Sequence, residues 1–140
     1  MPYPAIDYAA IDPGIRGLVL TLNGLPGIRT VGSCEGHDDP SETQHALGEW
    51  FVSFHVFHTK GGVKSLALLA DALNHTGVYT GPDREAASLV TLTVHSHNHT
   101  RPWYALNSTP YAGDWLTPED FRQIVRRLQR EGPGQRRVHP

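Results

Sequence analysis

The sequence is poor in several residue types whose abundance would by itself indicate a protein class. It contains one cysteine in 140 residues, which excludes an intramolecular disulfide and favours a reducing compartment. It has no run of about 18 consecutive apolar residues, and its first residues lack the basic and apolar regions of a signal peptide. We therefore expect a cytoplasmic protein with no membrane partner.

The sequence also lacks a large excess of charge of either sign, because the formal net charge is only -2. This balance gives no reason to expect nucleic acid or membrane binding over the whole surface. The basic residues nevertheless gather at one end, where half of the twelve lysines and arginines fall in the last twenty positions: Arg122, Arg126, Arg127, Arg130, Arg136 and Arg137. They are interpreted as a solvated helix face, with contact to RNA phosphates as the alternative.

A hydrophobic content of 39% over this length is enough for one core. The patterns predict one α+β domain over residues 1–134, with a mixed sheet packed by helices, and a loose basic tail over 135–140. The predicted order is α-β-β-α-β-β-α. Helices are expected over 13–23, 63–73 and 118–131, strands over 28–33, 49–58, 78–80 and 88–97, and long loops over 34–48 and 98–115.

The most informative segment is the end of the first predicted strand, which carries the only cysteine between two glycines. Its candidate site residues are Thr30, Ser33, Cys34, Glu35, Gly36 and His37. Cys34 is a candidate nucleophile with His37 as its base. A turn that binds a polar ligand through Ser33, Glu35 and the Gly36 backbone is the second interpretation. A small buried thiol that only packs is the third.

Histidines form a second candidate site. His95, His97 and His99 alternate along a predicted strand and its continuation, so two of them could share a zinc or other transition-metal ion. A histidine-rich polar sheet face is the alternative. His55 lies inside the apolar strand 49–58, and it would act with His95 as an acid-base pair if the two strands were neighbours.

The long loop over 98–115 supplies further candidate ligand contacts. Arg101 and Trp103 are placed where they could bind and stack on a planar, nucleotide-like molecule, whereas packing of the loop onto the core is the alternative.

The order of these pieces, with Leu22-Asn23, a strand into Thr30, Ser33-Cys34-x-Gly36 and His55-Val56, resembles the tRNA wybutosine-synthesising methyltransferases over roughly residues 15–97. The resemblance implies a compact α+β fold and S-adenosylmethionine-dependent methyl transfer to a guanosine of tRNA. Thr30, Ser33, Cys34, Gly36 and His55 occupy matching positions.

Three functions follow as hypotheses. The first is an enzyme that acts on a nucleoside- or nucleotide-like small molecule, for which the resemblance implies methyl transfer. The second is a non-catalytic protein that binds such a molecule through the Cys34 turn, Arg101 and Trp103. The third is a metal-dependent enzyme built on His95, His97 and His99.

Overall fold

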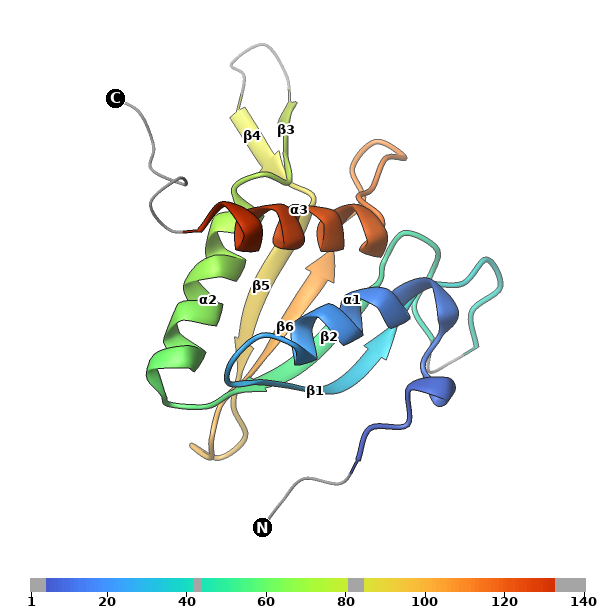
Figure 1. Cartoon of the computed structure of the whole chain (residues 1–140). Coiled ribbons are helices and arrows are strands. Elements are labelled where there is room, and N and C mark those ends of the chain that lie inside the picture. Colours follow the sequence, from blue (N-terminus) through green and yellow to red (C-terminus); the bar gives the residue numbers. More distant parts are fainter. Residues whose placement is uncertain (1–4, 42–43, 81–84, 133–140) are drawn as a thin grey trace.

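The computed structural model describes residues 5–41, 44–80 and 85–132 (Figure 1). Its helical elements are a short 3-10 turn η1 (Tyr8–Ala10), α1 (Pro13–Asn23), α2 (Lys60–Leu73) and α3 (Pro118–Glu131). Its strands are β1 (Ile28–Cys34), β2 (Phe51–Val56), β3 (Gly77–Thr80), β4 (Glu85–Ser88), β5 (Val90–His95) and β6 (Trp103–Ser108). The α+β class is confirmed, and the element order matches the predicted one apart from β6 and the division of the strand predicted over 88–97.

The main sheet has four strands in the order β1-β2-β6-β5. Every pairing among these described strands is antiparallel, so the expectation of a mixed sheet is wrong in this detail. β3 and β4 form a separate two-stranded hairpin. The turn predicted at 81–83 and the tail predicted over 135–140 lie outside the described residues.

β6 falls in the segment predicted as a loop. Tyr104 and Leu106 point toward the core, while Trp103, Ala105 and Asn107 lie at the alternate positions. The predicted strand 88–97 is also corrected: β4 and β5 are distinct, and β5 ends at His95.

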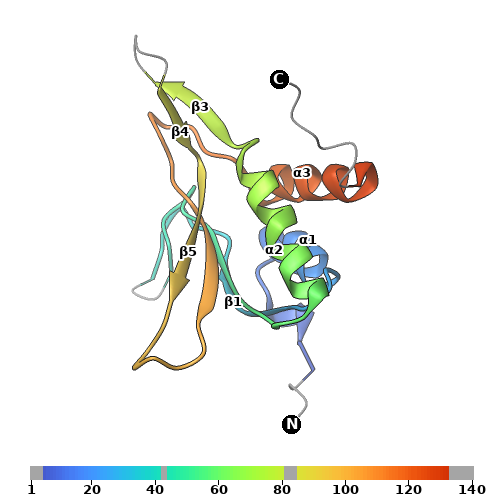
Figure 2. The ribbon, with the colours of Figure 1, turned by 90° about the vertical axis from the view of Figure 1, so that its left-hand side faces the viewer.

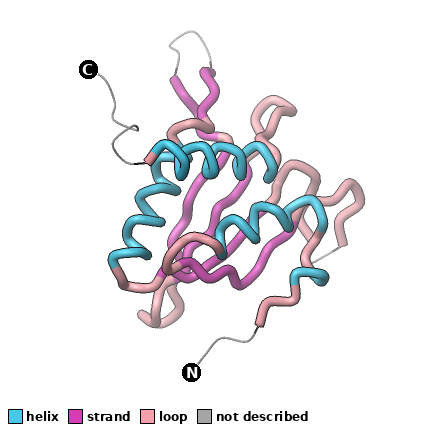
Figure 3. Tube along the Cα trace, viewed as in Figure 1, coloured by secondary structure: helices cyan, strands magenta, loops and turns pink. Residues whose placement is uncertain are grey.

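The three helices cover one face of the sheet and leave the other without a helix (Figures 2 and 3). The core lies between these layers. Phe54 and Leu106 from the sheet pack with Leu22 of α1, Leu69 of α2 and Phe121 of α3, all of them inaccessible to solvent. Among the described residues, none of the helices is both long enough and apolar enough to cross a membrane.

The helix ends follow from local chemistry. Thr117 accepts a hydrogen bond from the Asp120 amide, and the Asp120 carboxylate accepts one from the Thr117 amide, a complete capping box at the start of α3. α2 begins before Gly61-Gly62, which were expected to precede it, because the Thr59 hydroxyl accepts the Gly62 amide and caps the helix there.

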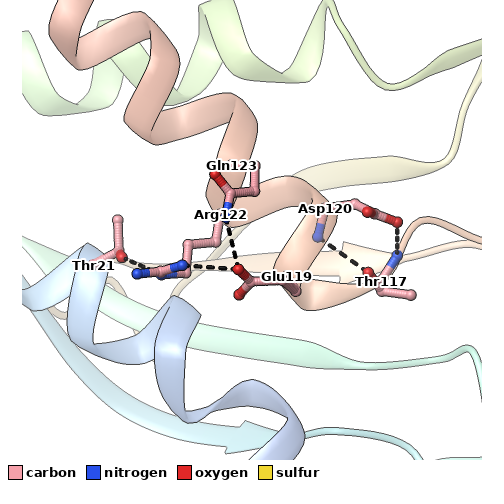
Figure 4. Close-up of polar contacts among 6 residues, drawn as sticks. All are labelled: Thr21, Thr117, Glu119, Asp120, Arg122 and Gln123. Atoms are coloured by element: carbon pink, nitrogen blue, oxygen red, sulfur yellow. Dashed lines mark hydrogen bonds and ion pairs between the residues drawn. The ribbon is translucent and has the colours of Figure 1, made fainter.

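A polar contact joins α1 to α3 (Figure 4). Arg122 donates from Nε to the Thr21 hydroxyl at 3.1 Å and from Nη1 to the Glu119 carboxylate at 2.8 Å. Arg122 therefore helps to hold two helices together, and its guanidinium is only partly exposed. This structural contact removes one arginine from the basic face predicted for the last helix.

Candidate functional site

Three side chains that bind metals in proteins converge at the end of β1. Asp12, Cys34 and His37 each offer one ligand atom, and these atoms lie within 4.8 Å of one another. Cys34 is buried, whereas Asp12 and His37 are partly exposed. Among the described residues this is the only group of three or more histidine, cysteine or carboxylate side chains with such spacing. We call it the Asp-Cys-His group.

Asp12 does not act as a helix cap, the role that its position before Pro13 predicts. It stands at the N-cap of α1, before Pro13, but its carboxylate caps no amide of that helix. Instead Oδ2 accepts the Glu35 amide at 3.1 Å and lies 3.2 Å from His37 Nε2. The carboxylate is therefore held toward the end of β1, which is the kind of orientation that supports a metal ligand.

His37 Nε2 is the atom whose surroundings are hardest to explain by packing. It is shielded from solvent and lies 3.2 Å from Asp12 Oδ2, an ion pair when the imidazole is protonated, but it makes no aligned hydrogen bond to any described residue. A buried polar atom without such a hydrogen bond is costly. A metal ion between the two side chains would remove that cost, because it would coordinate Nε2 and the carboxylate oxygen together.

The separation of the Asp12 and His37 ligand atoms matches that of two zinc ligands. Zinc bonds of about 2.0 to 2.1 Å to nitrogen and oxygen place two ligand atoms roughly 3.3 Å apart at a tetrahedral angle. Asp12 Oδ2 and His37 Nε2 are 3.2 Å apart. With the Cys34 thiolate as third ligand, one coordination position would stay open, as in catalytic zinc sites.

The loop after Cys34 is fixed by its own backbone. Gly36 has φ +85°, and a Cβ there would lie 2.8 Å from the Ala46 carbonyl oxygen. The His37 amide donates to the His45 carbonyl at 2.9 Å, which closes the loop. The expected role of Gly36 as a point of ligand approach is therefore not supported, because the space beside it holds the protein's own chain.

Glu35 also has a structural position. Its side chain lies over Gly14 in the first turn of α1, where any Cβ on residue 14 would collide with the carboxylate. An acidic group at this end of a helix is stabilised by the helix dipole. The Glu35 carboxylate thus takes the place beside α1 that Asp12 leaves.

A cavity of about 450 Å³ adjoins the group. It runs along β1, which is an edge strand among the described strands, and Asp12 lines it. The other lining residues are Ala5, Ile6, Ala10, Ile11, Arg29, Thr30, Val31, Gly32 and Ser33. It therefore combines apolar walls with one guanidinium and two hydroxyls, and it includes Thr30 and Ser33 from the predicted ligand-binding set.

Thr30 is held by a residue that sequence reasoning missed. Asn23 at the end of α1 accepts the Thr30 amide at 2.9 Å and donates to the Thr30 hydroxyl at 2.8 Å. The side-chain nitrogen of Asn23, Nδ2, also donates to the Tyr8 hydroxyl at 3.2 Å. Thr30 is buried, so its hydroxyl serves this clamp of α1, β1 and the N-terminal segment.

The predicted metal ligands His95, His97 and His99 are not brought together. Only His95 belongs to β5, whereas His97 and His99 lie in the turn that follows, and His99 has φ +61°. All three are exposed. The alternation expected along a continuing strand fails because the chain turns immediately after His95.

His55 and His95 lie on the same face of the sheet but not on neighbouring strands. β6 separates β2 from β5, so the two backbones are roughly 10 Å apart across the sheet. The condition on which the His55 and His95 acid-base pair depended is therefore not met. His95 instead stacks on Trp103, with ring centroids 5.4 Å apart and planes at 17°.

Arg101 and Trp103 lie far from the Cys34 turn, at the opposite end of the sheet. Trp103 begins β6, and Arg101 precedes it, with its guanidinium carbon 4.9 Å from the centre of the Phe57 ring. The structure therefore separates the predicted ligand residues into two places, and only Thr30 and Ser33 belong to the cavity beside Asp12.

No protein-family model, curated protein or solved structure matches this chain.

Proposed function

We propose that this protein is a metal-dependent enzyme that acts on a small nucleotide-like molecule, with a zinc-like ion held by Asp12, Cys34 and His37. The observation that carries the proposal is the buried His37 Nε2, which has no hydrogen-bond partner among the described residues and lies 3.2 Å from Asp12 Oδ2. The metal-dependent function predicted from the sequence thus moves from the three exposed histidines to the end of β1.

The donor set favours zinc among common ions. A thiolate, an imidazole and a carboxylate combine soft and borderline ligands, which suit zinc better than magnesium or calcium. Such an ion supplies Lewis acidity and lowers the pKa of a bound water to about 7. Asp12 Oδ2 is oriented by the Glu35 amide, and Asp12 also lines the cavity.

The cavity supports a substrate with both a flat or apolar part and an anionic part. Its volume of about 450 Å³ lies in the range of small-molecule sites. Ile6 and Ile11 provide apolar walls, and Arg29 provides a cation suited to a phosphate or carboxylate. A nucleotide has these features. S-adenosylmethionine, which the resemblance to wybutosine-synthesising methyltransferases implies, is a second ligand of compatible size.

The metal is tested first, with the ion alone. Protein stripped with a chelator is titrated with Zn²⁺ against a chromophoric competitor, and about one equivalent is expected to bind. Cys34→Ser and His37→Gln should each weaken binding by at least about tenfold. His45→Gln is the matched control, because His45 lies in the same loop outside the Asp-Cys-His group and packs against Phe51 with the two rings tilted by 44°.

Cobalt gives an independent readout. Co²⁺ bound at the group should show a thiolate-to-metal charge-transfer band that Cys34→Ser abolishes and His45→Gln retains. The metal centre would be refuted if Cys34→Ser and His37→Gln, like the control His45→Gln, left metal binding unchanged. It would also be refuted if the folded wild-type protein bound no stoichiometric metal.

The cavity is tested separately by calorimetry with adenosine monophosphate and with S-adenosylmethionine. Arg29→Ala should lower the affinity for adenosine monophosphate, whereas Arg126→Ala on the exposed face of α3 should leave it unchanged. Equal affinities for the two variants would remove the cavity from the proposal.

A further inference from the structure

Figure 2 shows that one face of the main sheet is not covered by a helix. The sequence places an unusual set of side chains at the outward strand positions of that face. The register places the outward positions of β2, β6 and β5 in rows across the strands. Ser53, Ala105 and Thr93 form one row. Trp103 and His95 form the next, and His55 on β2 continues it by alternation. We call the sheet face carrying these six residues, of which Ala105 is buried and His55 partly buried, the open face.

Aromatic rings occupy one end of the open face. Trp103 is partly buried, and its ring stacks with exposed His95 at a centroid distance of 5.4 Å. Two residues before Trp103, the guanidinium of Arg101 lies over the Phe57 ring, 4.9 Å from its centroid. The planar groups of Trp103, His95 and Arg101 therefore come together at the end of the sheet formed by β5 and β6.

The outward positions of β2, β6 and β5 include no aspartate or glutamate, and Arg101 adds a positive charge beside the end of the open face. Asn107 and Thr93 add polar groups, joined by a hydrogen bond of 3.0 Å. An anionic partner with planar groups would find rings, guanidinium and hydrogen-bonding side chains on one surface, without a carboxylate to repel it.

We propose that the open face binds single-stranded RNA. A four-stranded antiparallel sheet with helices on one side is suited to this role, because unpaired bases stack on aromatic residues of its exposed face. Trp103 and His95 provide the stacking surface, and Arg101 provides the phosphate contact. The row from His95 to His55 spans roughly 10 Å, which accommodates about two or three nucleotides.

This surface is favoured over the basic face of α3 for RNA contact. In α3, Arg122 is engaged with Thr21 and Glu119, and Arg127 lies 3.9 Å from Glu131. These arginines are therefore partly neutralised by carboxylates of their own helix. The helix also presents no aromatic ring on its exposed side, where Arg126 and Arg130 lie.

The proposal is tested by fluorescence anisotropy with a short labelled oligouridylate at low salt. Trp103→Ala should weaken binding by about 5- to 150-fold, the loss that corresponds to about 1 to 3 kcal/mol of stacking on one base. Trp103→Phe should restore most of it and guards against misfolding of the alanine variant. Arg101→Ala should weaken binding and reduce its salt dependence.

Matched controls separate the open face from other surfaces. Trp115→Ala removes an exposed tryptophan in the segment before α3, and Arg126→Ala with Arg130→Ala removes two helix arginines; both should leave affinity unchanged. The measurements use metal-free protein and are repeated with Cys34→Ser, so loss of the proposed metal centre does not affect them.

Absence of micromolar binding by the wild-type protein would overturn the proposal, as would equal binding by wild type and Trp103→Ala. A larger loss from the α3 variants would assign the contact to that helix instead. Tighter binding of the corresponding oligothymidylate would overturn the choice of RNA over DNA.

Discussion

Replacement of Asn23 by alanine tests the clamp that fixes β1 beside the cavity. The asparagine side chain makes three hydrogen bonds, two with Thr30 and one with Tyr8. Each contributes about 1 kcal/mol net to stability. Alanine also leaves the Thr30 amide without a partner at the β1 edge, and an unsatisfied buried donor costs about 1 to 3 kcal/mol.

The hydrogen bond to the Thr30 amide and the cost of leaving that amide without a partner describe the same interaction, so the two energies are not added in full. The expected loss in the free energy of unfolding for Asn23→Ala is therefore about 2 to 4 kcal/mol. Thr30→Val is the matched comparison. It removes only the hydroxyl partner of Asn23, keeps the hydrogen bond from the Thr30 backbone amide to Asn23 and preserves side-chain volume. The free energy of unfolding should therefore fall by about 1 kcal/mol. Tyr8→Phe removes the longest of the three bonds and should cost least.

Urea unfolding followed by tryptophan fluorescence measures these losses directly, with the slope against denaturant as a check on two-state behaviour. Asn23→Ala and Thr30→Val should also be coupled in a double-mutant cycle by at least about 0.5 kcal/mol. A loss below about 0.5 kcal/mol for Asn23→Ala, or one no larger than that of Tyr8→Phe, would refute the clamp.

Other substitutions test separate parts of the structure by the same unfolding assay. Gly36→Ala should cost well over 1 kcal/mol, because it adds a contact with the Ala46 carbonyl to the strain of positive φ, whereas Gly113→Ala, at φ +84° with no atom nearby, should cost only about 1 kcal/mol; equal losses would contradict this. Thr117→Ala should cost about 1 kcal/mol through the lost capping box, and an unchanged midpoint would show that the box is not stabilising. Phe121→Ala should cost about 3 to 5 kcal/mol, since the ring is fully buried against Trp50, and a loss below 2 kcal/mol would indicate that the site collapses.

Local signals predicted the bounds of α1 and α3 well because the residues at their ends are close in sequence, whereas α2 begins three residues before its predicted start at 63. Asp12-Pro13 and Asn23-Gly24 bracket α1, and the Thr117 box begins α3. β6 was harder to predict, because its aromatic pair Trp103-Tyr104 follows a proline and a turn with polar residues. The position of the strand depends on pairing with β2 and β5, which are distant in sequence.

The candidate site was predicted in part. Cys34 and His37 stand close together in the sequence, and the glycines around them indicated a turn. Asp12 lies more than twenty positions earlier and resembles an ordinary helix cap, so no spacing pattern connects it with Cys34. Its contact with the Glu35 amide arises only from the packing of α1 beside β1.

A bulge in β1 explains how one short strand serves both the clamp and the metal-binding group. The register shifts between Thr30 and Gly32, which leaves Val31 as an extra, exposed residue. Thr30 pairs with Phe54 and shares its core-facing side, whereas Cys34 pairs with Phe51 and shares the opposite side. Without the extra residue, positions 30 and 34 would alternate onto the same face. The bulge thus allows Thr30 to meet Asn23 while Cys34 turns toward His37, so the geometry of the Asp-Cys-His group depends on an irregularity that the alternation of residues along the strand does not predict.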